Sequence, residues 1–465
     1  MQEFDLVVIG AGPGGYVCAI RAAQLGKKVA IIEANHLGGI CLNWGCIPTK
    51  SLLRSAEVFH LMQNAKSFGL SAEKISANLK DIVARSRSVA SQLSSGIATL
   101  LKKANVIVFM GHASFISSSK IIVEGEKKVE ISAKKFVIAT GARAKKIPAF
   151  EPNGVNILTY KEAMTQEALP KALVVIGSGA IGIEFASFYN TLGVDVTVIE
   201  AQDRILPVED YEVSNFAKKS FEKHGMKIFT SASLKVVKSA KSHVDVEFES
   251  GGAKHSLKPD KVIMAVGITP NTENLNLKNT KVSMNERGFI QVDAHLKTKD
   301  DNIYAIGDMV EGPWLAHKAS HEGIIAAEVI SGHKTHKLNK KQIPGCTYSM
   351  PQIASIGLTE EKAKLVGLTI KVGRFPFAGN GKAIALGEPE GFVKLIFDEK
   401  TGELHGAHMI GAEVTELINS MALAMSLEAT EEDIMNTIFP HPTLSEMIHE
   451  SALSAYNRAI HIPNK

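Results

Sequence analysis

Two copies of one local pattern constrain the fold of this chain more than any other feature. Each copy is an apolar strand, a glycine-rich turn, a stretch with helical spacing and a second apolar strand that ends on glutamate. The first copy covers residues 5–33 with GAGPGG at 10–15, and the second covers 173–200 with GSGAIG at 177–182. Glycine at the first, third and sixth turn positions permits a tight turn, close approach of a pyrophosphate and close packing of helix on strand. The chain is therefore predicted to contain two parallel βαβ units that each bind a dinucleotide.

This pattern assigns glycines and glutamates to the two sites. A carboxylate at the end of the second strand holds a ribose hydroxyl and would repel a ribose 2′-phosphate. Glu200 therefore favours NAD over NADP, although Arg204 lies only four residues later and argues in the opposite direction. The residues assigned to dinucleotide contact are Gly10, Gly12, Gly15, Gly177, Gly179, Gly182, Glu33 and Glu200.

A pair of cysteines follows the first unit. Cys41 and Cys46 lie in the stretch GGICLNWGCIPTK at 38–50. Pro48 is favoured in the first turn of a helix, which places Cys46 at or just before a helix N-terminus, where unpaired N–H groups stabilise a thiolate. A disulfide that closes so short a loop stabilises little and is easily reduced, so we interpret the pair as redox-active. Lys50 is either a solvated helix-end lysine or a cation beside the reactive sulfur.

Composition restricts the class of protein. At 465 residues the chain is too long for one hydrophobic core and is expected to form about three or four domains. A net charge of +4 without a long basic run does not indicate binding to nucleic acid or to anionic membranes. Four cysteines argue against a secreted disulfide scaffold, and neither a transmembrane run nor a signal peptide is expected, so a cytoplasmic location is predicted. No set of residues has metal-ligand spacing, so no metal is predicted.

A histidine near the C-terminus has unusual neighbours. The stretch FPHPTLSE at 439–446 places prolines on both sides of His441, which fixes where its imidazole points. Glu446 follows five residues later and suits the orienting partner of a general base. The other interpretation is that Thr443 and Glu446 form a helix capping box.

Two other acidic residues lie next to predicted elements. Asp308 ends a strand-like run and is, by itself, equally compatible with a turn. Glu184 follows the second glycine turn and is either an exposed helix residue or a group that reaches towards the nicotinamide. The remaining predicted elements are a long helical region over about 51–104, strands at 348–356, 369–374, 391–397 and 404–410, and a helix around 413–427.

Taken together, these motifs resemble those of the pyridine nucleotide–disulfide oxidoreductases over nearly the whole chain. The resemblance implies an α/β fold with two Rossmann-like dinucleotide-binding domains and a C-terminal α+β interface (dimerisation) domain. It implies an FAD-binding domain whose first part is 1–147, an NAD-binding domain at 148–268, a central domain at 269–341 that completes the FAD site, and an interface domain at 342–465. The segments that carry it are GAGPGG (10–15), GGICLNWGCIPTK (38–50), ATGA (139–142), GSGAIGIE (177–184), IYAIGD (303–308) and HPTLSE (441–446).

The resemblance also implies cofactors and residue roles. FAD would occupy the first dinucleotide site and NAD the second. Cys41 would be the interchange sulfur and Cys46 the sulfur against the flavin, while His441, oriented by Glu446, would act from the second subunit of a homodimer. Lys50, paired with Glu184, would stabilise reduced flavin. The further cofactor contacts that the resemblance implies are Gly38, Gly39, Lys50, Ala113, Thr140, Gly141, Asp308, Ala316 and Gly267.

The substrate expectation also comes from the resemblance. The segments YVCAIRAAQLG (16–26), LAHKASHEG (315–323) and HPTLSE resemble those of members that oxidise protein-bound dihydrolipoamide with NAD. Such members serve 2-oxoacid dehydrogenase complexes, whose lipoyl domains would be partners. The alternatives are a reductase of another small disulfide, such as glutathione, and a non-enzymatic redox-sensing subunit. The chain departs from the family pattern at Ile40, Thr49, Ser349 and Gln352.

Overall fold

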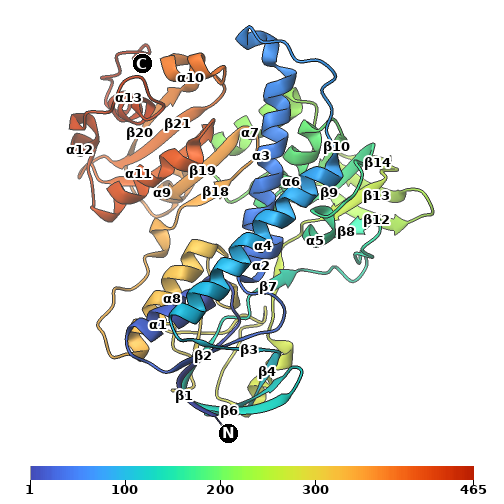
Figure 1. The fold of residues 1–465 in the computed structure, drawn as a ribbon. Helices are drawn as coiled ribbons and strands as arrows, with labels where there is room; N and C mark the ends of the chain where they lie inside the picture. The colour runs from blue at the N-terminus through green and yellow to red at the C-terminus, as the bar shows by residue number, and fades with distance from the viewer. Residues whose placement is uncertain (1, 465) are drawn as a thin grey trace. The chain divides into compact units, whose positions relative to one another are not determined.

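The computed structural model describes residues 2–464, which divide into two compact units (Figure 1). The first unit contains the residues up to Leu52 together with Lys80–Lys145 and Gly267–Lys340. The second contains Leu53–Leu79, Lys146–Val266 and the residues from Lys341 onward. Each unit carries one of the two glycine turns, so the internal duplication of the sequence is a duplication of sheet-based domains.

The first unit is built on a seven-stranded sheet in the order β3-β2-β1-β6-β5-β4, with β17 paired to β6. The pairs among β1, β2, β3, β6 and β17 are parallel, and β4, β5 and β6 form an antiparallel meander. Parallel strands are buried on both faces, which explains the unbroken apolar runs of the sequence. The strands are β1 (Gln2–Ile9), β2 (Val29–Glu33), β3 (Ile107–Met110), β4 (His112–Ser117), β5 (Lys120–Glu124), β6 (Lys128–Ile138) and β17 (Ile303–Ala305).

Helices α1 (Pro13–Gln24) and α8 (Ala316–Ile330) lie side by side in this unit (Figure 1). Their backbones approach so closely that a Cβ added to Gly323 would lie 2.5 Å from the carbonyl oxygen of Gly14. Leu6 and Val8 of β1 pack in the same apolar cluster as these helices, whereas Val7 and Ile9 pack on the opposite face. The contact of α1 with α8 therefore depends on glycine, because any side chain would separate the two helices.

The long helical region expected over 51–104 is confirmed over most of its length, but a non-helical stretch interrupts it. The structure has α3 (Cys46–Gln63), a short 3₁₀ turn (Ala65–Phe68) and then α4 (Leu79–Lys103). Gly69 adopts the left-handed conformation with φ 74°, which ends the 3₁₀ turn. Most of the residues over 70–78 are exposed, so this stretch has no apolar face to pack as a helix.

The second unit contains a parallel sheet in the order β11-β10-β9-β15-β8 and a separate antiparallel sheet of β12, β13 and β14. An apolar cluster joins the two, with Val174 and Val262 on the parallel sheet and Phe248 on the antiparallel one. Helix α6 (Ala180–Thr191) follows the second glycine turn, and α7 (Tyr211–Lys223) begins at an Asp210 cap. The strands are β8 (Ile157–Leu158), β9 (Ala172–Ile176), β10 (Asp195–Ile199), β11 (Lys227–Phe229), β12 (Ser233–Ser239), β13 (Val244–Ser250), β14 (Ala253–Leu257) and β15 (Lys261–Met264).

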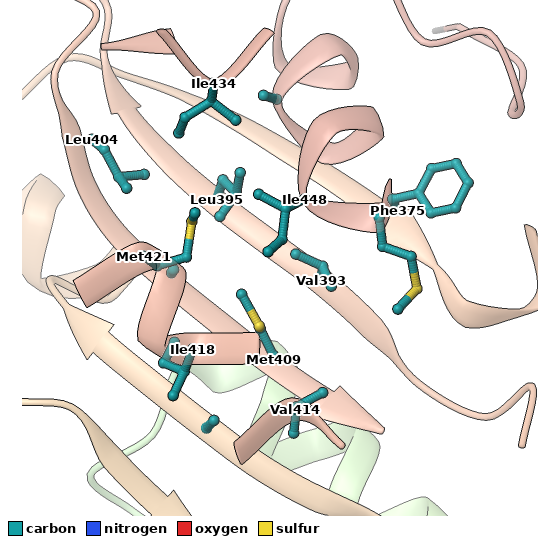
Figure 2. Close-up of a cluster of buried hydrophobic side chains, with 14 of the residues drawn as sticks. Phe375, Val393, Leu395, Leu404, Met409, Val414, Ile418, Met421, Ile434 and Ile448 are labelled. Atoms are coloured by element: carbon teal, nitrogen blue, oxygen red, sulfur yellow. The ribbon is translucent and has the colours of Figure 1, made fainter. Parts of the chain in front are cut away.

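The C-terminal part of the second unit is an α+β domain. Its antiparallel sheet has the order β18-β19-β22-β21-β20, and α11 (Val414–Ser426), α12 (Glu431–Asn436) and α13 (Glu446–Ala455) contribute to its core. Figure 2 shows that core, in which Leu395 and Met409 of the sheet lie with Ile418 of α11 and Ile448 of α13. The strands are β18 (Gly345–Thr347), β19 (Gln352–Gly357), β20 (Ile370–Pro376), β21 (Phe392–Asp398) and β22 (Leu404–Gly411).

The strand expected at 348–356 is confirmed only from residue 352 onward, because residues 348–351 form an irregular connection between β18 and β19. Pro351 has no N–H to donate to a sheet, which suits it to this connection and not to a strand interior. The remaining short α-helices are α2 (Gly39–Trp44), α5 (Tyr160–Ala163), α9 (Glu360–Leu365) and α10 (Gly381–Leu386), and the remaining strands are the paired β7 (Ala142–Ala144) and β16 (Ile268–Pro270). Among the helices of residues 2–464, none combines the length and apolar character that a membrane crossing requires.

Candidate active site

The first glycine turn has the shape that close approach of a dinucleotide requires. A Cβ at Gly10 would lie 2.3 Å from the carbonyl oxygen of Ala139, and one at Gly15 would lie 1.9 Å from that of Gly10. At Gly12, by contrast, the nearest atom to an added Cβ is 3.9 Å away, so the backbone there is open to a ligand. The turn leads into α1, whose first N–H groups have no partner within the helix and can bind a phosphate.

The second glycine turn repeats this geometry in the second unit. A Cβ at Gly177 would lie 2.4 Å from the Ala265 carbonyl oxygen, and one at Gly182 would lie 2.0 Å from that of Gly177. Nothing lies within 4 Å of a Cβ added to Gly179. Both turns therefore combine two sterically obligatory glycines with one open glycine, and both fit a dinucleotide.

Glu33 and Glu200 have equivalent contacts. Oε2 of Glu33 accepts the Ala11 N–H at 2.8 Å, and its Oε1 accepts the Asn35 N–H at 2.8 Å. Oε2 of Glu200 accepts from the Ser178 N–H at 2.8 Å and the Ser178 hydroxyl at 2.6 Å. The sequence pattern assigned these carboxylates to a ribose alone, whereas the structure shows that each also holds its glycine turn in place.

The cysteine loop packs directly on the first glycine turn. The Gly38 N–H donates to the Ala11 carbonyl at 2.8 Å, and a Cβ at Gly39 would lie 2.6 Å from the Cα of Gly12. Helix α2 contains Cys41, and α3 begins at Cys46, so the predicted helix start at Cys46 is confirmed. The two cysteines are thereby attached to the turn that would hold the first dinucleotide.

The two sulfurs form a dithiol in the structure. A hydrogen bond with Cys46, followed by burial and the charge of Cys46, raises the pKa of the Cys41 thiol. Lys50 opposes this rise in the pKa of Cys41, and Asp308 adds to it, so both charged groups act on the same sulfur. Burial and the charge of Cys41 raise the pKa of Tyr16, a neighbour that the sequence motifs did not identify. The residues that act on the Cys41 thiol are therefore its partner Cys46 and the charged groups Lys50 and Asp308.

Helix α4 holds this loop through contacts that no sequence motif indicated. Arg87 donates to the carbonyl oxygen of Asn43 at 2.6 Å, and its guanidinium lies over the ring of Trp44 at 4.7 Å. Ser94 donates to the carbonyl oxygen of Leu37 at 2.7 Å, and Arg85 donates to the Ser51 hydroxyl at 2.7 Å. These bonds join residues about 34 to 57 positions apart, which is why no local pattern reveals them.

The other residues expected near the first cofactor lie in the first unit with varied surroundings. Thr140 donates to the Asn271 carbonyl at 2.8 Å, and Gly141 has φ 67°. Ala316 is the first residue of α8, and Ala113 lies in the apolar core on β4. Gly267, expected in the NAD site, has φ 104° and accepts from the Lys145 N–H at 2.9 Å. The contacts of these residues with a cofactor stay a prediction.

His441 and Glu446 meet in the second unit. His441 Nδ1 lies 2.9 Å from Glu446 Oε1, and the Thr443 N–H donates to Glu446 Oε2 at 2.8 Å. Both sequence interpretations of Glu446 therefore hold in part, although Thr443 donates its hydroxyl to Pro440 and does not complete a capping box. Burial would raise the pKa of Glu446, but these hydrogen bonds outweigh burial and lower it. The His441 side chain is 79% exposed, so its Nε2 side is accessible.

Glu184 is not the exposed helix residue that one interpretation expected. It is buried on α6 and its Oε1 accepts the Tyr348 N–H at 3.0 Å, while Ser187 one turn later accepts the Met350 N–H at 3.0 Å. The turn between β18 and β19 is thus bound to the nucleotide-binding helix within the second unit. The expected pairing of Glu184 with Lys50, like the approach of His441 to Cys41, stays a prediction.

Three of the four departures from the family pattern have structural explanations. Gln352 accepts from the Thr415 hydroxyl at 2.8 Å and so binds the first turn of α11. Ser349 donates to the Pro351 carbonyl at 2.7 Å, and Thr49 donates to the Gly45 carbonyl at 2.7 Å. Nothing in the structure explains Ile40, which lies partly exposed in α2.

Comparison with known proteins identifies the same family that the sequence motifs resemble. The sequence signature described as pyridine nucleotide-disulphide oxidoreductase matches residues 4–323, and that of the dimerisation domain of the same family matches 343–452. The chain is 52% identical to the dihydrolipoyl dehydrogenase of Zymomonas mobilis and 50% identical to that of Rhizobium etli, each over 99% of both chains.

Solved structures agree at the level of the fold. The crystal structure of LpdA from Mycobacterium tuberculosis superposes with a TM-score of 0.90 at 27% identity, over 97% of this chain and 99% of that one. The HOCl-induced flavoprotein disulfide reductase RclA of Escherichia coli gives a TM-score of 0.85 at 28% identity, over the same shares of the two chains. With its two glycine turns, its dithiol and its C-terminal α+β domain, this chain belongs to the pyridine nucleotide-disulphide oxidoreductase family.

Proposed function

We propose that this protein is a dihydrolipoyl dehydrogenase, which oxidises protein-bound dihydrolipoamide to lipoamide and reduces NAD⁺ to NADH. The observation that carries the proposal is the attachment of the Cys41–Cys46 dithiol to the first glycine turn, through the 2.8 Å bond from Gly38 to Ala11. Such an arrangement places a two-electron sulfur pair beside a dinucleotide site. Relatives that share about half of the sequence carry this enzyme name.

The sulfur chemistry follows from the two cysteines and His441. In the oxidised protein the pair is a disulfide, and His441 Nε2 takes a proton from one substrate thiol, because only a thiolate attacks a disulfide efficiently. That thiolate attacks the sulfur of Cys41, the Cys41–Cys46 bond breaks, and Cys46 leaves as a thiolate. The second substrate thiol then attacks the substrate sulfur of the mixed disulfide and its proton passes to the departing Cys41 sulfur, which releases Cys41 as a thiol and forms lipoamide. Two electrons have passed from the substrate to the dithiol.

Residues of the first unit would hold FAD and direct these electrons. When bound, FAD supplies two-electron transfer between a dithiol and a nicotinamide. Gly10, Gly12 and Gly15 present the backbone to its pyrophosphate, and Glu33 lies at the strand end that faces its ribose. Lys50 lowers the pKa of Cys41 through its positive charge, and Asp308 raises it through its negative charge.

The second unit would hold NAD and the substrate base. Gly177, Gly179, Gly182 and Glu200 form the NAD turn, and Glu184 lies on the helix that follows it. The dimerisation-domain match supports a homodimer. We propose that His441 and Glu446 serve the disulfide of the partner subunit in that dimer. Lipoyl domains of a 2-oxoacid dehydrogenase complex are the proposed partners, and the cytoplasm is the proposed location. The proposed domains are the first part of the FAD-binding domain (1–147), the NAD-binding domain (148–268), the central domain (269–341) and the interface domain (342–465).

The test is a spectrum and a paired assay. Purified protein should be yellow, should lose flavin absorbance with NADH, and should oxidise dihydrolipoamide with NAD⁺ far faster than it reduces glutathione disulfide with NADH. A protein that prefers glutathione disulfide would contradict the substrate assignment and leave the dithiol–flavin assignment intact. A colourless protein, or one whose disulfide does not cycle, would contradict both.

A further inference from the structure

Helix α8 carries a buried ion pair that the proposed chemistry does not use. Lys318 Nζ lies 2.9 Å from Glu322 Oε1, and the two side chains are 0% and 1% exposed. They lie on successive turns of α8, within the segment LAHKASHEG (315–323), and contact the turn that follows β17. Burying two charges is costly, and apolar residues of similar volume would pack at such a site without that cost. Packing alone therefore does not account for the pair.

The pair holds one peptide of the turn that follows β17. Glu322 Oε2 accepts the Gly307 N–H at 2.7 Å, and Lys318 Nζ donates to the Gly307 carbonyl at 3.2 Å. Both hydrogen-bonding groups of Gly307 are thus fixed by α8. Gly307 has φ 76°, a left-handed conformation that glycine adopts without strain, and the chain continues directly into Asp308.

Asp308 is the residue whose position this peptide sets. Burial raises its pKa, Lys318 opposes that rise, and Glu322 adds to it, so both members of the pair also act on Asp308 electrostatically. The charge of Asp308 in turn raises the pKa of Cys41, a half-buried thiol that is hydrogen-bonded with Cys46. Hydrogen bonds therefore link the ion pair to Gly307, and the residue that follows Gly307 acts electrostatically on the redox sulfur.

We infer that Lys318 and Glu322 are positioning residues: through Gly307 they hold Asp308 at the proposed FAD site, where its charge acts on Cys41. Their role is to keep the aspartate in one place by fixing the peptide that precedes it. The inference rests on the proposed function only in taking Cys41 as the redox thiol and the first glycine turn as the FAD site.

The experiment compares four variants of the holoenzyme with the wild type. The double variant Lys318→Met/Glu322→Met replaces the pair with apolar side chains of similar volume. Glu322→Asp keeps both charges but shortens the arm that reaches the Gly307 N–H. Asp308→Asn removes the charge that the pair is inferred to position. The control is Arg21→Met/Glu328→Gln, which removes the 2.6 Å ion pair between α1 and α8 and leaves Gly307 untouched.

Three readouts separate positioning from general stability. Hydrogen exchange measured by mass spectrometry should show the Gly307 amide exchanging roughly tenfold faster in the double variant and in Glu322→Asp. The rate of FAD loss should rise by roughly tenfold, the effect of about one lost hydrogen bond. In the NADH-reduced protein, the pH profile of Cys41 alkylation should move to lower pH by roughly one unit, as it should in Asp308→Asn, because displacing a negative charge favours the thiolate.

The α8 control should match wild type in all three readouts. The inference would be overturned if Glu322→Asp and the double variant both matched the wild type in all three readouts: Gly307 exchange, the rate of FAD loss and the pH profile of Cys41 alkylation. If the double variant does not fold, Glu322→Asp alone decides, since it retains the charge pair. Lipoamide turnover of the wild type is measured in parallel: its absence would contradict the proposed function, whereas the exchange and alkylation results would still test the inference.

Discussion

Nδ1 of His441 lies 2.9 Å from Oε1 of Glu446, and the second oxygen of the carboxylate is bound by the Thr443 N–H. A carboxylate can only accept, so Nδ1 carries the proton and Nε2 presents its lone pair outward. The imidazole is therefore held in the tautomer that a general base requires. The same carboxylate is anchored to the backbone, which keeps the imidazole from rotating.

Replacing the base should separate the two half-reactions. We expect His441→Gln to lower kcat for dihydrolipoamide oxidation by roughly 10²- to 10⁴-fold, the usual contribution of a positioned base. Reduction of the flavin by NADH in a stopped-flow instrument should stay at the wild-type rate, because that step does not use the imidazole. His243→Gln, which disrupts another histidine–carboxylate pair in the second unit, is the matched control and should retain full activity. Full lipoamide activity in His441→Gln would show that another group is the base.

Glu446 should matter less than His441 and in a recognisable way. Glu446→Gln keeps an oxygen that can accept from either Nδ1 or the Thr443 N–H but removes the charge that stabilises the imidazolium. We expect a smaller loss of kcat than in His441→Gln, with the acidic limb of the pH–rate profile shifted to lower pH because the protonated imidazole is less stabilised. An unshifted profile would mean that Glu446 only caps α13.

Cys41 and Cys46 should be distinguishable by colour. In Cys41→Ser, the Cys46 thiolate remains and should produce long-wavelength absorbance with oxidised flavin, recorded in the visible spectrum as pH is raised. Cys46→Ser should lack that band at every pH, and neither variant should oxidise dihydrolipoamide. The same band in both variants would refute the assignment of the two sulfurs.

Discrimination between NAD and NADP should depend on two acidic residues. Arg204, whose charge suits a 2′-phosphate, is held by Glu361 through two bonds of 3.0 Å. We expect Glu361→Gln to raise kcat/KM for NADP⁺ several-fold by releasing the guanidinium. Glu200→Gln, which still accepts from Ser178, should raise the KM for NAD⁺ by roughly tenfold, since a charge-assisted hydrogen bond becomes neutral. Unchanged NADP⁺ kinetics in Glu361→Gln would place Arg204 away from the 2′ position.

Acid stability should depend on a charged cluster in the second unit. Glu360 Oε2 lies 2.8 Å from Lys394 Nζ and 2.9 Å from Arg374. Burial would raise the pKa of Glu360, but the hydrogen bonds from Lys364 and Lys394 prevail and hold it at about 2. Because this folded-state pKa lies below the ordinary 4.5, the stabilisation is fully present above pH 4.5 and is lost as the pH falls towards 2.

The urea midpoint of unfolding, followed by circular dichroism, should therefore fall steeply for the wild type over that window. Glu360→Gln should have a lower midpoint at neutral pH and a flatter dependence between pH 4.5 and 2. Glu432→Gln, at an exposed position, should follow the wild-type curve. Parallel curves for Glu360→Gln and wild type would show that the cluster does not govern acid unfolding.

Much of the fold could be predicted because its determinants are local. Gly10, Gly15, Gly177 and Gly182 stand where a Cβ would meet a backbone oxygen at about 2 Å, so the turn geometry leaves its imprint as a fixed spacing of glycines. The start of α3 at Cys46 follows from Pro48 in the same manner. The helical region expected over 51–104 is interrupted at 70–78, which the helical spacing of the sequence did not reveal, because most of these residues are exposed and have no face to bury.

The sequence by itself therefore determined the two dinucleotide turns, the cysteine pair and the histidine with its carboxylate, since each depends on residues within a few positions of one another. Only the tertiary structure decided that Arg87 of α4 lies over Trp44, that the Tyr348 N–H binds Glu184, and that Lys318 and Glu322 hold Gly307. Arg87 and Glu184 meet partners far along the chain, and Lys318 and Glu322 reach back to the turn before their helix. All are brought together by burial of the sheets and helices that carry them. Such contacts leave no period or spacing in the sequence, because packing, and not local backbone geometry, selects the partner.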